Sequence, residues 1–399
     1  MAATDDPKQK PGAISQSLTV AAAMLLGSTA DAAVLPEERA DALFHHYDGG
    51  GMEISGPSVL VRKNFRDRFS VTANYYVDSV TSASIDVTTT ASPYTEERTE
   101  TRLGADYLHD KTSMGISWTR SEESDYLAST VGFSLSQDFF GDLSSLSFGY
   151  ALGTDEVRRN GDALFSESVD RHSFRLGWSQ VLSRKAVAGL ALEVTADEGF
   201  LNNPYRSVRY VDSYDEGNPL DPSDDVPLSY AYQPESYPDT RTSTAVALRA
   251  AYHLPWQDAL KVEYRFYTDT WGIGAENIEL GYSRDLDQHW RLDGRVRTYS
   301  QNHADFYSDL YPYQNAQDNL ARDKEMSTFD SLLLGMGASY IIKAPETSSW
   351  KQMSFNLQVD FIQFDYSDFR DLRKAGQPGT EPMYSYDATV TRLFYSLWF

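Results

Sequence analysis

The chain has 399 residues, with 35 basic and 58 acidic side chains and no cysteine, and its formal net charge at pH 7 is −23. This acidity argues against a nucleic-acid partner, because a polyanion needs a basic surface. The lack of cysteine excludes disulfides, thiolate metal sites, a cysteine nucleophile and haem attachment through a CxxCH motif. The length fits two or three soluble domains or one large all-β barrel.

The N-terminal residues have the pattern of a secretory signal peptide. Lys8 and Lys10 precede an apolar run over 18–27, and the small-residue triplet Ala30-Asp31-Ala32 follows. Such a basic, then apolar, then small-residue order is typical of an export signal, and a short N-terminal helix is the alternative. No later stretch approaches the roughly 20 apolar residues of a membrane helix. We therefore expect a signal peptide over 1–32 and one exported domain over 33–399.

Apolar and polar residues alternate with a period of two along most of the chain after residue 50. In the segment 68–78, the apolar positions are Phe69, Val71, Ala73, Tyr75 and Val77. The same pattern recurs in 112–120, 170–182, 258–269 and 351–365. Such alternation is typical of strands with one apolar and one polar face.

The pattern predicts sixteen strands. They are expected at 40–48, 54–63, 67–78, 99–109, 112–120, 126–138, 143–153, 170–182, 185–196, 241–253, 258–269, 275–286, 289–300, 328–343, 351–365 and 386–399.

The connections between these strands alternate between short and long. Short turns such as 110–111 and 183–184 alternate with long segments at 79–98, 154–169, 197–240, 301–327 and 366–385. Outer-membrane barrels have this asymmetry, with short periplasmic turns and long extracellular loops. The sequence therefore predicts an all-β fold: a transmembrane antiparallel β-barrel of about 16 strands, located in the bacterial outer membrane, with its apolar faces toward lipid.

The chain ends in a strand pattern, Leu393 to Phe399, in which alternate residues are apolar. A terminal strand ending in Phe resembles the signal that the barrel-assembly machinery reads. We expect Phe399 to serve as that signal, with this machinery and the lipid of the outer membrane as partners.

Several segments resemble an uncharacterised family of proteobacterial outer-membrane β-barrel proteins, the domain-of-unknown-function 3570 family. They include Tyr47-Asp-Gly-Gly-Gly51, Gly56-Pro-Ser-Val-Leu-Val-Arg-Lys63, Asn203-Pro-Tyr-Arg206, Tyr237-Pro-Asp-Thr-Arg241 and Arg322-Asp-Lys-Glu325. The resemblance implies an architecture and a location, and it supplies no catalytic residues. It also implies a role as a sleeve for an exported electron-transfer partner, periplasmic or a lipoprotein. The chain has no haem or thiol motif, so any flavin or haem would belong to that partner.

The acidic segment 197–240, rich in Tyr and Pro, contains the only metal candidates. Asp221, Asp224 and Asp225 offer hard oxygen donors. No EF-hand spacing accompanies them, so a solvated surface loop is the favoured interpretation. A plug that folds into the lumen is a further alternative.

A set of charged residues alternates with the apolar positions of the predicted strands. These lumen-facing candidates are Arg175, Lys261, Glu263, Arg265, Arg295 and Arg297. In a porin, such side chains set the ion preference, and in a narrow barrel they form salt bridges that fill the interior. The sequence leaves both interpretations open.

No catalytic or cofactor motif emerges. The seven histidines are scattered, and the sequence contains no HExxH, GxSxG or glycine-rich phosphate loop. We therefore expect a non-enzymatic, porin-like channel for ions or small polar solutes, with cation preference set by the acidic loops. The sleeve is the first alternative, and a barrel-embedded hydrolase is the second.

Overall fold

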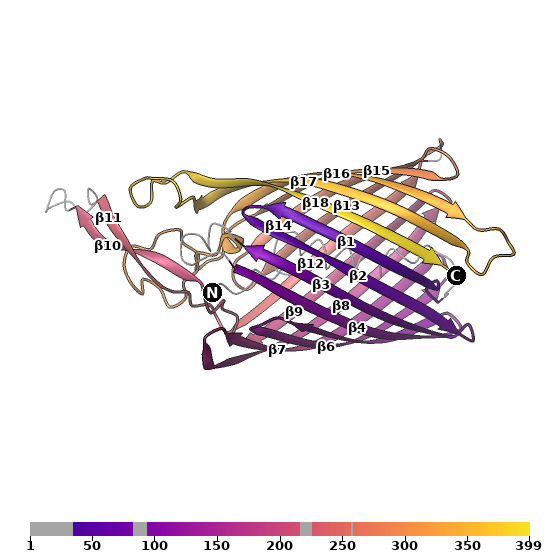
Figure 1. Ribbon diagram of the computed structural model, residues 1–399, viewed down its shortest axis with the longest axis horizontal. Helices are drawn as coiled ribbons and strands as arrows, with labels where there is room; N and C mark the ends of the chain where they lie inside the picture. The colour runs from indigo at the N-terminus through magenta and orange to yellow at the C-terminus, as the bar shows by residue number, and fades with distance from the viewer. Residues whose placement is uncertain (1–34, 83–93, 216–225, 257) are drawn as a thin grey trace.

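The computed structural model describes residues 35–82, 94–215, 226–256 and 258–399, most of which form a closed antiparallel barrel (Figure 1). The first nine strands are β1 (Arg39–Gly49), β2 (Met52–Phe65), β3 (Phe69–Ser82), β4 (Tyr94–His109), β5 (Thr112–Glu122), β6 (Tyr126–Phe139), β7 (Ser144–Arg159), β8 (Asp162–Ser183) and β9 (Ala186–Gly199). The remaining barrel strands are β12 (Thr240–His253), β13 (Ala259–Asp269), β14 (Gly274–Asp285), β15 (Trp290–Gln301), β16 (Phe329–Lys343), β17 (Gln352–Arg370) and β18 (Met383–Trp398).

Two further strands, β10 (Ser207–Asp215) and β11 (Val226–Pro234), form a separate hairpin that projects beyond one end of the barrel (Figure 1). The short 3₁₀ helix η2 (Lys324–Met326) lies in the loop between β15 and β16. Among the described residues, no helix has the length and hydropathy needed to cross a membrane.

Each of the sixteen predicted strands overlaps one strand of the barrel, so the predicted fold class is confirmed. One predicted connection is wrong: 154–169 is not a long loop, because β7 and β8 continue to a two-residue turn at 160–161. This extension carries polar residues on both faces, so the apolar alternation that marks a lipid-facing strand stops before the strand does. The hairpin β10–β11 was not expected. The proposed signal peptide, 1–32, lies outside the described residues.

The two ends of the barrel differ in their connections. At one end, which we call the short-turn end, the connections run from two residues at 110–111 to eight at 344–351. The long connections 200–239, 302–328 and 371–382 all lie at the other end, which we call the mouth. The barrel therefore has the predicted asymmetry of short turns and long loops.

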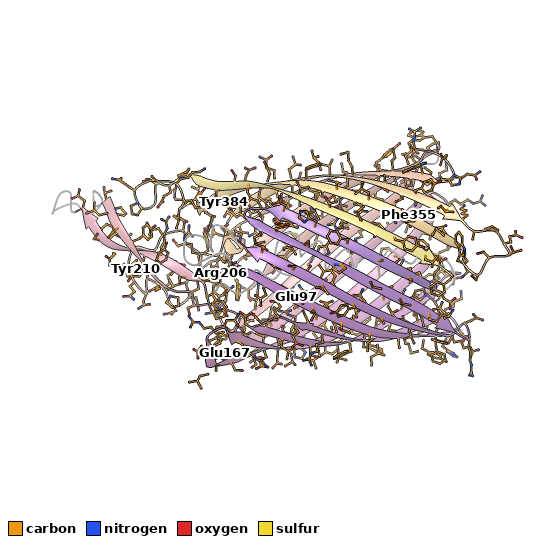
Figure 2. The ribbon with its side chains drawn as sticks, in the orientation of Figure 1. Glu97, Glu167, Arg206, Tyr210, Phe355 and Tyr384 are labelled. Atoms are coloured by element: carbon orange, nitrogen blue, oxygen red, sulfur yellow. The ribbon has the colours of Figure 1, made fainter. Side chains whose placement is uncertain are left out.

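Large apolar side chains cover the outside of the barrel. Ile116 and Met336 keep 61% and 66% of their surface exposed. Ring pairs near the short-turn end, Phe69–Tyr107 and Phe355–Tyr395, have centroids 4.9 and 5.0 Å apart, and Phe355 marks this region in Figure 2. An exposed apolar surface around a closed sheet, bordered by aromatic rings, suits contact with lipid.

The first and last strands close the barrel. β1 pairs antiparallel with β18 from Arg39↔Trp398 to Gly49↔Ala388. A Cβ atom on Gly49 would lie 2.3 Å from the Cβ of Ala388, so only glycine allows this approach. Phe399 follows β18 at the short-turn end, where the Lys63 ammonium lies 5.0 Å from its ring centroid. Its role as an assembly signal remains a prediction.

A second glycine makes room for an ion pair that crosses a strand inside the barrel. Arg295 on β15 reaches over β16 to Asp360 on β17, with Nη2 to Oδ2 at 2.5 Å. Gly335 on β16 lies between them, and a Cβ there would be 2.4 Å from Asp360 Oδ1 and 2.6 Å from Arg295 Cγ. The missing side chain is therefore a requirement of the ion pair.

We expect Gly335→Ala to separate Arg295 from Asp360 and to lower the free energy of unfolding by about 1–3 kcal/mol. Urea unfolding of the reconstituted barrel, followed by tryptophan fluorescence, measures this loss. Gly294→Ala on β15 is the matched control, because a Cβ at Gly294 meets nothing within 4 Å. Equal unfolding midpoints for the two variants would contradict the role of Gly335.

Candidate functional site

The loop that joins β15 to β16, residues 302–328, folds back over the mouth, and we call it the mouth loop. Its backbone donates to neighbouring loops, with Asp305 N to Trp271 O at 2.8 Å. It also pairs with the segment after β11, where Ser236 and Leu320 exchange two backbone hydrogen bonds of 2.7 and 3.0 Å. These bonds hold the mouth loop in one position against the rest of the mouth.

A buried aromatic cluster fixes the mouth loop to the inner face of the barrel. The loop contributes Phe306, Tyr307 and Met326, and the strands contribute Tyr299, Phe329, Leu333, Ile362, Phe364, Tyr366 and Tyr384. Alternate residues of β16 and β17 face inward, so these apolar side chains stand where a water-filled barrel would carry polar ones. Apolar packing therefore fills the lumen along this wall at the mouth end.

Tyr311 shows how closely the mouth loop packs. Its side chain is fully buried, and its hydroxyl group donates to Phe306 O at 2.6 Å. The same oxygen accepts from Ala321 N at 2.9 Å. Because one hydroxyl group ties two distant parts of the loop, the loop is a packed unit.

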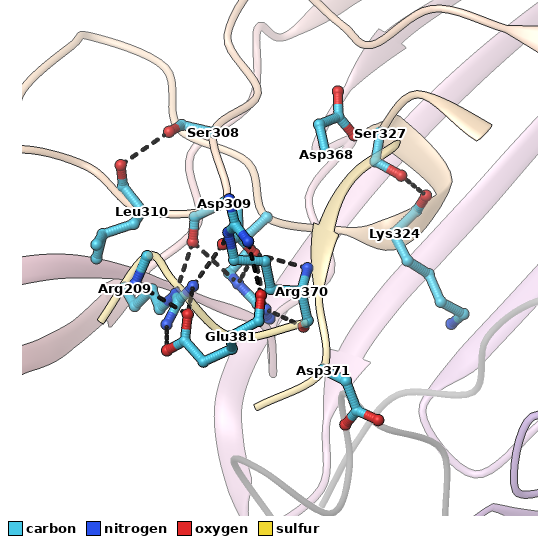
Figure 3. Close-up of polar contacts among 12 residues, drawn as sticks. Arg209, Ser308, Asp309, Leu310, Lys324, Ser327, Asp368, Arg370, Asp371 and Glu381 are labelled. Carbon is cyan, nitrogen blue, oxygen red and sulfur yellow. Dashed lines mark hydrogen bonds and ion pairs between the residues drawn. The ribbon is translucent and has the colours of Figure 1, made fainter. Parts of the chain in front are cut away.

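Ion pairs among five charged residues hold the mouth loop to the hairpin and to the β17–β18 connection: Arg209, Asp309, Arg322, Arg370 and Glu381. We call this group the latch, and Figure 3 labels all of its members except Arg322. The guanidinium group of Arg209 is fully buried, contacts Asp309, and binds Glu381 with Nη1 to Oε1 at 2.6 Å. Arg322 Nη2 lies 2.9 Å from Asp309 Oδ1. Arg370 Nη1 donates to Glu381 O at 2.6 Å.

The latch places three guanidinium groups against two carboxylates. Burial alone would lower the pKa of Arg209, but hydrogen bonds from its guanidinium group to Glu381 and the charge of Asp309 raise it above its ordinary value. A buried cation with two buried carboxylates is stable only as a complete set, because removal of one member leaves an uncompensated charge.

Glu235, just after β11, lies buried beside the latch. Its Oε2 accepts from the Tyr237 hydroxyl group at 2.6 Å, and its Oε1 accepts from Arg322 N at 2.7 Å. Burial, together with the negative charge of Asp323, raises the pKa of Glu235 to about 7, although Arg206 opposes the shift. This carboxyl group therefore titrates near neutral pH.

A group of three carboxylates at the mouth could hold a cation. Oxygens of Glu96, Glu123 and Asp125 lie within 4.8 Å of one another. Hard oxygen donors of this kind suit Ca²⁺ or Mg²⁺. Sequence reasoning missed them, because they come from β4 and the β5–β6 connection and share no motif. The predicted metal candidates, Asp221, Asp224 and Asp225, lie outside the described residues.

The structure places all six predicted lumen-facing residues on the inner face of the barrel. Arg175 lies 3.4 Å from Glu193, Glu263 accepts from Arg249 Nε at 2.6 Å, and Arg295 binds Asp360. Asp360 also binds Arg392, whose Nη1 lies 2.9 Å from Oδ2. Lys261, Arg265 and Arg297 form no ion pair with any described residue. Glu193, Arg249, Asp360 and Arg392 were missed, although the same alternation marks them.

The histidines do not assemble a proton relay among the described side chains. His45 Nε2 binds both Asp78, at 2.7 Å, and the Tyr76 hydroxyl group, at 3.3 Å. His303 Nδ1 binds both Asp368 and Thr328. A Ser–His–Asp triad needs a carboxylate on one ring nitrogen and a nucleophile on the other, and at His45 and His303 both partners share one nitrogen.

We expect Arg209→Gln to release the mouth loop while leaving the barrel closed. Loss of the cation leaves Asp309 and Glu381 buried, at a cost of about 3–5 kcal/mol. Local opening should rise roughly 100-fold or more, since each 1.4 kcal/mol is a factor of ten. The rate of limited proteolysis within 302–328 measures this opening. The protein used is first shown to be folded by its change of electrophoretic mobility on heating.

Arg373→Gln is the matched control for that experiment. Arg373 pairs with Asp371 in the same β17–β18 connection, but 44% of its side chain is exposed. Cleavage in this variant should match the wild type. Equal cleavage of both variants would show that the latch does not hold the loop.

We expect the mouth loop to loosen as pH rises from about 4.5 to about 7. The pKa of Glu235 in the folded protein, about 7, is above its ordinary value of 4.5. Its protonated form therefore stabilises the fold fully below pH 4.5, and this contribution is lost as pH rises through 7. Amide exchange within 302–328, corrected for intrinsic rates, should follow this curve. Glu235→Gln should flatten it, whereas exposed Glu156→Gln should not; a pH-independent wild type would refute the expectation.

The fold resembles known barrels at low sequence identity. CdiB from Acinetobacter baumannii superposes with a TM-score of 0.46 and 8% identity, over 90% of this chain and 60% of that one. A bacterial polysaccharide outer membrane secretin gives 0.47 and 8% identity, over 92% and 100%. A Pseudomonas aeruginosa FadL homologue gives 0.40 and 9%, over 92% and 91%. Similarity at this level carries no argument about activity. Comparison with curated proteins finds no match.

The family is identified by sequence. The family model described as "Protein of unknown function (DUF3570)" matches residues 166–365, which is half of the chain. This span runs from β8 to β17 and includes the hairpin and the mouth loop. The chain therefore belongs to the DUF3570 family of proteins of unknown function, as the sequence resemblance predicted.

Proposed function

We propose that this protein is a channel for ions or small polar solutes in a bacterial outer membrane. The observation that carries the proposal is the inner wall of the closed barrel. Side chains that face the lumen there are charged and remain in contact with water: Arg175 keeps 45% of its side chain exposed, and Lys261 is exposed as well. Sixteen strands enclose a lumen wide enough for water unless protein fills it.

The outward apolar surface supports the membrane location. A closed barrel leaves no unpaired backbone edge, which is the condition for spanning hydrocarbon. The short turns and long loops at opposite ends are the arrangement of outer-membrane barrels, with the mouth on the extracellular side.

The mouth loop makes the entrance the narrow part of the proposed path. It packs on the inner faces of β15–β18 and is held by the latch, so solute entry depends on the space left beside it or on its release. The proposed channel therefore conducts less than an unobstructed barrel of the same strand number.

The hairpin supports a second function, a sleeve that binds an exported, flavin- or haem-bearing partner. It projects beyond the barrel and exposes apolar side chains, with Leu228 56% and Tyr232 41% exposed (Figure 1; Tyr210 marks this hairpin in Figure 2). Exposed apolar residues at the end of a projecting hairpin suit protein contact. A sleeve would bind this partner in mild detergent and conduct no ions alone.

Single-channel recording in planar bilayers tests the channel against the sleeve. We expect stable conductance steps from the wild type. These steps should be smaller than the conductance of an open barrel of this size, which is on the order of a nanosiemens. Arg209→Gln should raise the conductance or the open time, whereas Arg373→Gln should leave both unchanged. A folded barrel that is silent in all three forms would overturn the channel and favour the sleeve.

A further inference from the structure

The inward-facing charges change sign along the barrel. Positions along each strand count from its terminal residue at the short-turn end. The residues five to eight positions from that residue form a middle zone across the lumen. The charged inward residues there, besides His45, are Arg102, Arg175, Arg265, Arg295, Arg297 and Arg392 against Glu193, Glu279 and Asp360. We call the six arginines the belt. With histidine neutral, the zone carries three more positive than negative charges.

The zone on the mouth side has the opposite balance. Its inward strand positions include Arg98, Arg171 and Arg241 and the carboxylates of Asp78, Glu96, Glu100, Asp155, Asp197 and Asp269. Arginines here are matched or outnumbered, as in the pairs Arg171–Asp197 and Arg241–Asp269. A cation entering from the mouth would therefore meet attraction first and repulsion at the belt.

Half of the belt forms no ion pair within 4.0 Å among the described side chains. Arg295 and Arg392 share the single carboxylate of Asp360, and Arg175 faces Glu193. Arg102, Arg265 and Arg297 have no ion pair or side-chain hydrogen bond there. Arg265 is 7% exposed, and its Nε and Nη1 are buried without a hydrogen-bond partner. A buried guanidinium group with free donors is complementary to an oxyanion.

We infer that the belt makes this barrel selective for small anions and binds oxyanions, such as carboxylates and phosphates, on their way through. The inference rests on the proposed channel function and adds its solute class. Charge in a narrow passage with low-dielectric walls acts more strongly on a permeating ion than charge on exposed loops. The belt therefore outweighs the acidic loops, from which the sequence interpretation expected cation preference.

Reversal potentials across a KCl gradient test the selectivity of the full-length protein. We expect chloride to be more permeant than potassium in the wild type. The variant with Arg102→Gln, Arg265→Gln and Arg297→Gln removes the unpaired charges and should lower the chloride-to-potassium permeability ratio several-fold. Arg120→Gln is the matched control, because Arg120 points outward and pairs with Glu122. A cation-selective wild type, or equal ratios in triple variant and control, would overturn the inference while leaving the channel intact.

A second measurement needs no conduction and uses one substitution. The quantity measured is the temperature at which half of the barrel has unfolded, seen as a change of mobility in gel electrophoresis. Inorganic phosphate should raise this temperature for the wild type above its value in chloride of equal ionic strength. Arg265→Gln should lose most of this shift, and Arg120→Gln should keep it. If phosphate gives the wild type no shift, the oxyanion site is overturned. If the protein conducts no ions in planar bilayers but phosphate still raises its unfolding temperature, the belt binds anions and only the channel function fails.

Discussion

The structure depends on one constraint: in hydrocarbon, every backbone N–H and C=O group must find its partner within the sheet. The pairing of β1 with β18 meets it, since the eleven register pairs from Arg39↔Trp398 to Gly49↔Ala388 leave the barrel no edge. Closure also assigns the two faces of every strand. One face meets lipid and must be apolar, and the other is left for the chemistry of the lumen.

The lumen solves the problem of burying polar groups in two ways. At the mouth, apolar rings from the mouth loop replace water and pack on β15–β18, and the buried charges of the latch lie in ion pairs. In the middle, arginines outnumber carboxylates, and three of the arginines form no ion pair within 4.0 Å among the described residues. The first arrangement gives rigidity. The second leaves guanidinium groups with free hydrogen-bond donors, and such groups suit a passage for anions better than a structural core.

Sequence alone predicted the sixteen strands because each membrane strand shows the contrast between lipid and lumen directly as a period of two. The prediction of strands failed where a strand continues beyond the lipid and this contrast is lost. β7 and β8 continue beyond the lipid with polar residues on both faces, so the segment 154–169 resembled a loop. The hairpin β10–β11 buries Val208 and Val211 only against the mouth loop and its surroundings, and the outer half of β10 is exposed, so no alternation of apolar and polar residues over a whole strand marks it.

The candidate site was beyond sequence reasoning for a different reason. Arg209 and Glu381 are 172 positions apart and meet only through the way that two loops cross the mouth. The acidic loops suggested a cation preference, because the sequence shows how many charges a segment carries but not their depth in the barrel. The depth of Arg265 or Arg297 follows from strand register, which only the closed sheet defines. The sequence predicted individual lumen-facing residues. It did not predict that arginines outnumber carboxylates in the middle zone.

The neighbour of β9 in the sheet is β12, although the 40 residues 200–239 separate them along the chain. The whole hairpin segment is therefore an insertion in a turn between adjacent strands, and its length has no influence on the register of the barrel. Entrance and interior are in this sense separate modules. A longer or shorter hairpin segment would change the entrance without moving any arginine of the belt.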